Sequence, residues 1–269
     1  MVIMSRFFLF AIFFFISLQV YPIDINPSVS THAYAMGNTI TVVPGLANPA
    51  YFGFSRYAYA SIQYVNRYGV KELSTFSAQL NLPNNYLDTA VLLSRFGCSD
   101  YNETVLGTNF YKQVSAHLSI GIQTNLYYLK QTEQTAKLVV VGNVGLLARP
   151  FDSLELSLLL VNPLRSVVHY GATKVRLPAL LLVGMAYHWQ DKAQITFELE
   201  KDVLFPLVVK TGLEYQPIST FSIRLGMFGK PFTPTFGFGV WCKNFLLDFG
   251  CSKHPVLGFR SSCGLTYRF

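Results

Sequence analysis

Apolar and polar residues alternate along much of this chain with a period of two residues. Between positions 193 and 200, apolar residues occupy every odd position and polar residues every even position. The same alternation recurs over 114–126, 207–216 and 221–227. Successive side chains of a β-strand point to opposite faces, so this pattern predicts strands with one apolar and one polar face.

Turn residues divide the chain into about fourteen such strands. Short turns are indicated at Asn84-Asn85, Asp152-Ser153, Asp191-Lys192, Pro217–Ser219 and Lys243-Asn244. The predicted strands are 57–65, 73–82, 86–96, 105–111, 114–129, 136–148, 153–161, 178–188, 193–201, 206–215, 220–228, 234–241, 245–252 and 259–269. Their spacing is even and no linker interrupts it, which indicates one all-β domain. The longest polar connection runs from Arg165 to Arg176.

The composition places these strands in a membrane. Apolar residues make up 51% of the chain, charged residues only 13%, and the mean hydropathy is +0.33, whereas soluble domains average about 25% charged residues. Beyond the amino-terminal segment, the best apolar run, 177–189, is interrupted by Pro178 and is too short for a spanning helix. Since only helices and closed barrels satisfy the backbone in lipid, we predict a transmembrane antiparallel β-barrel.

The amino-terminal region divides into two parts ahead of the barrel. Residues 1–20 contain Arg6 followed by the apolar run 7–20, which is the layout of a secretory signal peptide. We therefore expect export to a bacterial outer membrane. Residues 21–56 are predicted to form a short plug, because a barrel of about fourteen strands encloses more space than its own side chains fill. The barrel itself is assigned to residues 57–269.

The last predicted strand places aromatic and apolar residues on one face. These residues are Phe259, Cys263, Leu265, Tyr267 and Phe269, the final residue. The segment resembles the closing strand of bacterial outer-membrane proteins. That resemblance implies that Tyr267 and Phe269 serve as the signal for the barrel assembly machinery, and that outer-membrane lipids surround the chain.

A second resemblance lies ahead of the first strand, at Asn48-Pro49-Ala50 within the segment Gly45–Ala50. This motif is similar to the amino-terminal hatch of the FadL-like transporters of long-chain fatty acids, a superfamily that includes the PorV-like barrels of diderm bacteria. The resemblance implies a fourteen-stranded barrel with a plug, through which a hydrophobic small-molecule ligand passes. This chain is much shorter than those transporters.

Four charged residues fall on the predicted inner faces of three neighbouring strands: Glu198, Lys210, Glu214 and Arg224. Opposite charges on adjacent strands can pair across the sheet and narrow the bore. Independently solvated side chains are the alternative, since exposed pairs contribute only about 0–1 kcal/mol.

Other kinds of chemistry have little support in the sequence. The net charge of +7 is scattered over strand ends instead of one face, which argues against nucleic acid. No catalytic, metal or cofactor motif is recognisable, and a barrel lipase would have to use Ser115, His117 and Ser119 on one lumen-facing strand. Cys251 and Cys263 are expected on outward faces of adjacent strands, offset diagonally, as small apolar residues or as a disulfide.

Three functions remain: a FadL-like conduit for hydrophobic compounds such as fatty acids, a structural or secretion-associated PorV-like barrel, and a general diffusion porin. The hatch motif and the modest polarity of the predicted lumen favour the conduit.

Overall fold

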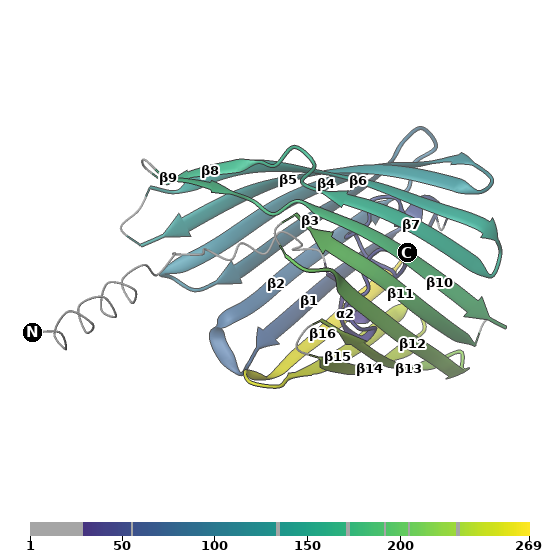
Figure 1. The fold of residues 1–269 in the computed structure, drawn as a ribbon. Helices are drawn as coiled ribbons and strands as arrows, with labels where there is room; N and C mark the ends of the chain where they lie inside the picture. The colour runs from purple at the N-terminus through teal and green to yellow at the C-terminus, as the bar shows by residue number, and fades with distance from the viewer. Residues whose placement is uncertain are drawn as a thin grey trace, which may run out of the picture.

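The computed structural model describes residues 29–54, 56–132, 135–170, 173–190, 192–203, 205–229 and 232–269 (Figure 1). The predicted signal peptide, 1–20, and the first part of the predicted plug lie outside the described residues. The segment 29–54 carries two short helices, α2 (Thr31–Ala35) and the 3-10 helix η1 (Tyr51–Gly53). No helix of the described ranges is long and apolar enough to cross a membrane.

The remainder forms a closed antiparallel barrel of fourteen tilted strands. The strands of its first half are β1 (Tyr59–Arg67), β2 (Val70–Leu82), β3 (Asp88–Gly97), β4 (Tyr101–Ser115), β5 (Leu118–Gln131), β6 (Lys137–Phe151) and β7 (Leu154–Val161). Those of its second half are β10 (Leu180–Trp189), β11 (Ala193–Asp202), β12 (Val208–Ile218), β13 (Phe221–Phe228), β14 (Thr233–Cys242), β15 (Phe245–His254) and β16 (Gly258–Arg268). β1 pairs with β16, with Ile62 opposite Leu265, and this pairing closes the barrel. The predicted fold class and strand number are confirmed.

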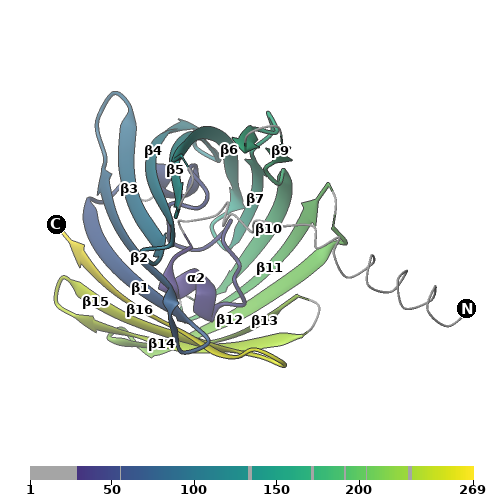
Figure 2. The same ribbon diagram turned by 90° about the vertical axis from the view of Figure 1, so that its left-hand side faces the viewer.

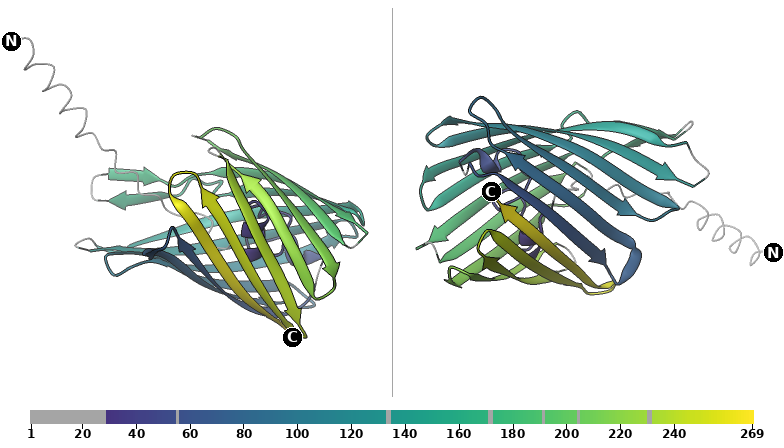
Figure 3. Two further views of the ribbon diagram at one scale, coloured as in Figure 1. Left: turned by 90° about the horizontal axis from the view of Figure 1, so that it is seen from below. Right: turned by 180° about the vertical axis from the view of Figure 1, so that it is seen from behind.

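The structure adds one element and moves one strand end. The long connection after β7 contains a hairpin that the strand list did not include, formed by β8 (Val167–Tyr170) and β9 (Thr173–Arg176) at one rim of the barrel (Figure 3). β4 also continues to Ser115 instead of ending near 111, and the hairpin turn falls at Ala116-His117. Ser115 and His117 are therefore exposed at a turn, while Ser119 is buried in β5. The three residues do not share a strand face, which removes the geometric basis for the lipase alternative.

The two faces of the barrel have opposite polarity. Outward side chains are large and apolar and remain exposed along the strands, such as Ile122, Phe197 and Leu213. Inward side chains at neighbouring positions are polar and buried, such as Gln123 and Glu198. An apolar outer belt around a polar interior is the arrangement of a transmembrane barrel.

The two ends of the barrel differ in the length of their connections. At the end that holds the carboxyl terminus, β4–β5, β6–β7, β12–β13 and β14–β15 are each joined by two residues. We call this the short-turn end. At the other end, the long-loop end, the connection from β7 to β10 contains the β8–β9 hairpin.

The assignment of faces makes a prediction about stability. Leu213 on β12 is 40% exposed on the outer face, while Gln216 of the same strand lines an internal cavity. Leu213→Arg should lower the free energy of unfolding by about 2–4 kcal/mol because it places a charge in hydrocarbon near the midplane. Gln216→Arg should cost much less. Folding titrations into lipid bilayers measure both, and equal losses would show that the faces are reversed.

Residues 29–54 lie inside the barrel and form its plug. Looking into the barrel, α2 sits within the ring of strands (Figure 2). The side chain of Ser30 caps this helix, since its Oγ accepts a hydrogen bond from the Ala33 amide at 3.1 Å and donates one to the Pro44 carbonyl at 2.7 Å. Almost every residue from Ser30 to Gly53 is buried. The plug therefore shares its core with the inner wall.

Candidate functional site in the barrel lumen

The carboxylate of Glu198 anchors the plug to the wall. Its side chain is fully buried on β11. Glu198 Oε2 accepts three hydrogen bonds of 2.8 Å from the plug, two from the backbone amides of Ile40 and Thr41 and one from the Thr41 hydroxyl. Burying a carboxylate costs free energy unless hydrogen-bond donors contact it. Burying these amide and hydroxyl donors likewise costs free energy unless they have an acceptor. These hydrogen bonds hold residues 39–43, the segment that follows α2, which we call the strap.

Lys210 on β12 balances the charge of Glu198. The two residues are directly opposite in the sheet, and Lys210 Nζ lies 2.9 Å from Glu198 Oε1. The same ammonium lies 2.6 Å from Glu200 Oε2. One buried cation therefore joins two carboxylates of β11, and Glu198 is the one with hydrogen bonds to the plug among the residues described.

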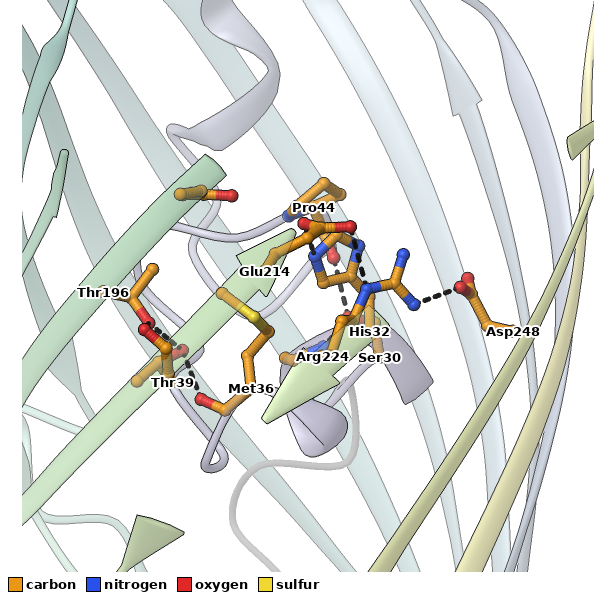
Figure 4. Close-up of polar contacts among 12 residues, drawn as sticks. Ser30, His32, Met36, Thr39, Pro44, Thr196, Glu214, Arg224 and Asp248 are labelled. Carbon is orange, nitrogen blue, oxygen red and sulfur yellow. Dashed lines mark hydrogen bonds and ion pairs between the residues drawn. The ribbon is translucent and has the colours of Figure 1, made fainter. Parts of the chain in front are cut away.

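A second charged cluster holds α2 (Figure 4). Arg224 on β13 lies 3.0 Å from Glu214 of β12, its direct partner in the register, and 2.5 Å from Asp248 of β15. The other oxygen of Glu214 lies 3.0 Å from Nε2 of His32, which belongs to α2. Charged side chains of β12, β13 and β15 and one plug residue thus form a continuous chain along one side of the inner wall.

The structure brings the four predicted lumen charges together as two pairs, Glu198 with Lys210 and Glu214 with Arg224. Sequence analysis missed Glu200, Asp248 and His32, which complete the clusters. Glu200 already falls on the polar face of the alternating segment 193–200 but was not counted among the lumen charges, and Asp248 could have been found by applying the alternation to the strand 245–252. His32 lies outside any strand, and no sequence signal placed it there. The role of these charges in permeation stays a prediction.

The Asn48-Pro49-Ala50 motif forms a tight turn against the wall. Asn48 Nδ2 donates to the Thr41 carbonyl at 2.8 Å, and Asn48 Oδ1 accepts from the Ala50 amide at 3.0 Å. The hydroxyl of Ser119 on β5 donates to the Ala50 carbonyl at 2.9 Å. The side-chain amide of Asn48 therefore links the plug segment at Thr41 to the turn at Ala50. The Ser119 hydroxyl links that turn to the barrel wall.

Glycines of β5 and β6 provide the space for this turn. A Cβ atom on Gly145 would lie 2.1 Å from Asn48 Oδ1, and one on Gly121 would lie 2.3 Å from the Pro49 carbonyl carbon. Such distances are far inside van der Waals contact. The turn can approach the wall only because both positions lack a side chain.

Gly145→Ala should therefore displace the turn while the barrel still assembles. Gly142→Ala is a matched control on the same strand, because a Cβ atom there would contact nothing within 4 Å. We expect Gly145→Ala to increase hydrogen exchange in residues 46–52 and to lower the thermal midpoint, with little effect from Gly142→Ala. Identical exchange in the two variants would contradict the seating of the motif.

An apolar cluster lies in the long-loop half of the lumen, next to buried polar residues of the same wall such as Asn125 and Asn143. Side chains from β4, β5, β6, β7 and β10 pack with the plug residues Met36, Ile40 and Val43 in one buried cluster. The wall residues are Val105, Tyr127, Leu129, Val139, Val141, Leu159, Val161 and Leu182. Val168 of β8 and Leu177, just after β9, cover this cluster. A packed hydrophobic cluster thus lies between the β8–β9 hairpin and the plug.

The short-turn half contains a cavity of about 240 Å³ with a different lining. Aromatic rings such as Tyr51, Phe52 and Trp241 alternate with glutamines, serines and the Glu214–Arg224–Asp248 cluster. Burial raises the pKa of the Tyr51 phenol well above its ordinary value, so that ring stays neutral. The plug therefore contributes both to the packed apolar cluster and to the lining of the polar cavity.

The carboxyl terminus completes the short-turn rim. The amide of Phe269 donates to the Ala58 carbonyl at 3.1 Å, and the Tyr267 ring contacts the rings of Phe245 and Phe269 at centroid distances of 4.8 and 5.1 Å. The proposed recognition of Tyr267 and Phe269 by an assembly machinery is not tested by this geometry.

The four cysteines are free thiols. Cys263 is directly opposite Phe249, and Cys251 is opposite Ser261. The two cysteines are thus offset by two residues, as the sequence predicted, and they do not form the disulfide that was the alternative.

Comparison with solved structures identifies the architecture. The chain is similar to the CymD monoaromatic hydrocarbon channel, with a TM-score of 0.65 and 11% identity over 91% of this chain and 98% of that one. It is also similar to the Pseudomonas putida toluene transporter TodX, with a TM-score of 0.63 and 11% identity over 88% and 95%. For a Pseudomonas aeruginosa FadL homologue the TM-score is 0.57, with 11% identity over 90% and 97%.

These likenesses establish that the chain has the fold of the FadL-type hydrocarbon channels, as its hatch motif had indicated. No protein-family model matches the sequence, and no curated protein matches it.

Proposed function

We propose that this protein is an outer-membrane conduit for small hydrophobic molecules, closed by the plug of residues 29–54. The observation that carries the proposal is the apolar inner wall of β4–β7 and β10 at the long-loop end. The lumen of a general diffusion porin is polar and filled with water. A wall of valine and leucine instead offers favourable transfer to an apolar solute, about 25 cal/mol for each Å² removed from water.

The fold neighbours support this assignment, since two of them are described as a monoaromatic hydrocarbon channel and a toluene transporter. Fatty acids are the other candidate cargo from the hatch resemblance. The apolar cluster of the wall is packed against Met36, Ile40 and Val43, so a solute can pass only when the plug or the β8–β9 hairpin moves. We assign the short-turn end to the periplasm, because outer-membrane barrels have short turns on that side.

Delivery to the outer membrane would depend on the predicted signal peptide, 1–20, and on recognition of Tyr267 and Phe269 by the barrel assembly machinery. A non-enzymatic role is consistent with the channel fold. The porin and PorV-like alternatives have no comparable observation in their favour.

Uptake of radiolabelled toluene and laurate into cells that express the protein tests the conduit. Val141→Asn, which makes the apolar wall polar, should reduce uptake several-fold. Val140→Asn is the matched control, because Val140 is the adjacent residue and faces outward. Uptake that equals the empty-vector level, or that is unaffected by Val141→Asn, would count against the proposal. Liposome swelling with sugars would then identify a porin.

A further inference from the structure

The cavity at the short-turn end contains a row of inward side chains on five neighbouring strands. Trp241 lies opposite Leu246, Leu246 opposite Thr266, Thr266 opposite Ser61, and Ser61 opposite Gln79, in unbroken register from β14 to β2. All five residues line the cavity. Arg268, two residues beyond Thr266 on β16, lines it as well.

Three polar groups at one end of this row have no protein partner. The hydroxyl of Ser61, the side-chain nitrogen of Gln79 and Nε of Arg268 are buried without a hydrogen bond. Ser61 is only 5% exposed and Gln79 only 4%. Gln79 Oε1 accepts a hydrogen bond of 3.4 Å from the Tyr59 hydroxyl, which leaves the amide nitrogen as the free group. All three groups can donate, so a single acceptor placed among them would satisfy all three.

The arrangement of charges around the cavity indicates that the acceptor is an anion. Glu214 and Asp248 are both paired with Arg224. Among the residues that the structure describes, no carboxylate lies within ion-pair distance of Arg268. Its guanidinium instead stacks on the rings of Tyr57 and Trp241, 4.3 and 4.2 Å from their centroids. The two carboxylates and two guanidinium groups of the lining balance formally, but both carboxylates lie against Arg224, so the side of the cavity beside Arg268 is locally positive.

The aromatic lining and the size limit the rest of the ligand. The Phe52 ring lies 5.0 Å from the Tyr59 ring and 5.7 Å from the Tyr57 ring, so flat apolar surfaces cluster beside the free donors. A cavity of about 240 Å³ is large enough for one small ring but not for a long alkyl chain. We propose that this cavity is a binding site for a small aromatic carboxylate, whose carboxylate accepts from Arg268, Gln79 and Ser61. The site is lined by none of the residues of the apolar cluster and does not rest on the proposed conduit function.

Fluorine NMR of 4-fluorobenzoate with the detergent-purified, full-length protein tests this site. The neutral analogue 4-fluorobenzyl alcohol controls for partition into detergent micelles. We expect saturable binding of the carboxylate and at least about tenfold weaker binding of the alcohol, because the alcohol lacks the charge that Arg268 would contact. Arg268→Gln should weaken carboxylate binding by a similar factor.

Two further variants test the site independently of Arg268, in case Arg268→Gln impairs assembly of the terminal strand. Gln79→Met preserves the volume but removes the free donor, and should weaken carboxylate binding several-fold. Arg149→Gln is the control, because Arg149 is at the same end of the barrel but is paired with Glu155 at 2.6 Å and does not line this cavity. Absence of binding at millimolar probe would mean that the cavity holds only water and would overturn the proposal. Equal affinity for acid and alcohol, or unchanged affinity in Gln79→Met, would also overturn it.

Discussion

Deletion of residues 29–43 should convert the closed barrel into an open pore. The deletion removes α2 and the strap bound to Glu198, while all fourteen strands and their pairings remain. Barrels of sixteen to eighteen strands leave an aqueous channel, and eight strands are filled by their own side chains. A fourteen-stranded barrel is close to the larger class, so loss of its filler should expose a continuous lumen.

The expected pore is selective because its lining would be charged. Glu198, Lys210 and Glu200 would remain paired, as would Glu214, Arg224 and Asp248. Planar-bilayer recordings should change from almost no current in the parent to stable open channels. Replacing Lys210 and Arg224 together with serine in this background should raise the conductance and shift the selectivity towards cations.

The full-length protein in the same bilayers is the control, and heat-modifiable migration would show that the shortened barrel has assembled. If the assembled deletion variant conducts no more current than its parent, residues 29–43 do not seal the barrel. The apolar cluster and the β8–β9 hairpin would then be the barrier.

The barrel could be predicted from the sequence because its signal is local. Each strand carries its own alternation, and the lack of charge excludes a soluble exterior, so the segments 193–201 and 220–228 were placed almost to the residue. The turn at Ala116-His117 was misplaced because odd-numbered residues face inward in both β4 and β5. The alternation therefore gives no sign of where one strand ends and the next begins. The β8–β9 hairpin was missed because its residues, such as His169 and Lys174, do not alternate with apolar ones.

The interior was less predictable because its contacts join residues far apart in the chain. The pairs Glu198 with Lys210 and Glu214 with Arg224 followed from adjacent hairpins and alternating faces. The contacts of Glu198 with Ile40 and Thr41 span more than 150 positions, and no periodicity encodes them. Asn48 was recognised as a turn residue, but its fit against Gly145 depends on where the plug lies inside the closed barrel.

Glu198→Leu should release the plug with the largest effect expected of any single substitution. The change leaves the amides of Ile40 and Thr41 and the Thr41 hydroxyl without an acceptor, each buried. An unsatisfied buried donor costs about 1–3 kcal/mol. Removal of one partner from a buried ion pair costs about 3–5 kcal/mol. Lys210 still has Glu200, which reduces the second penalty.

The barrel strands do not depend on this carboxylate, so the loss should appear as displacement of the plug rather than as unfolding. Hydrogen exchange should increase at residues 39–43, and brief channel openings should appear in bilayers. Glu200→Gln is the control. Glu200 contacts the same Lys210 ammonium as Glu198 does, but makes no contact with the plug in the hydrogen bonds described. Glu198→Gln should be intermediate, because its amide oxygen can still accept from the strap. If Glu198→Leu and Glu200→Gln show equal exchange and equal current, the segment 39–43 is held by the apolar packing of Ile40 and Val43 against the wall, and Glu198 is not its anchor.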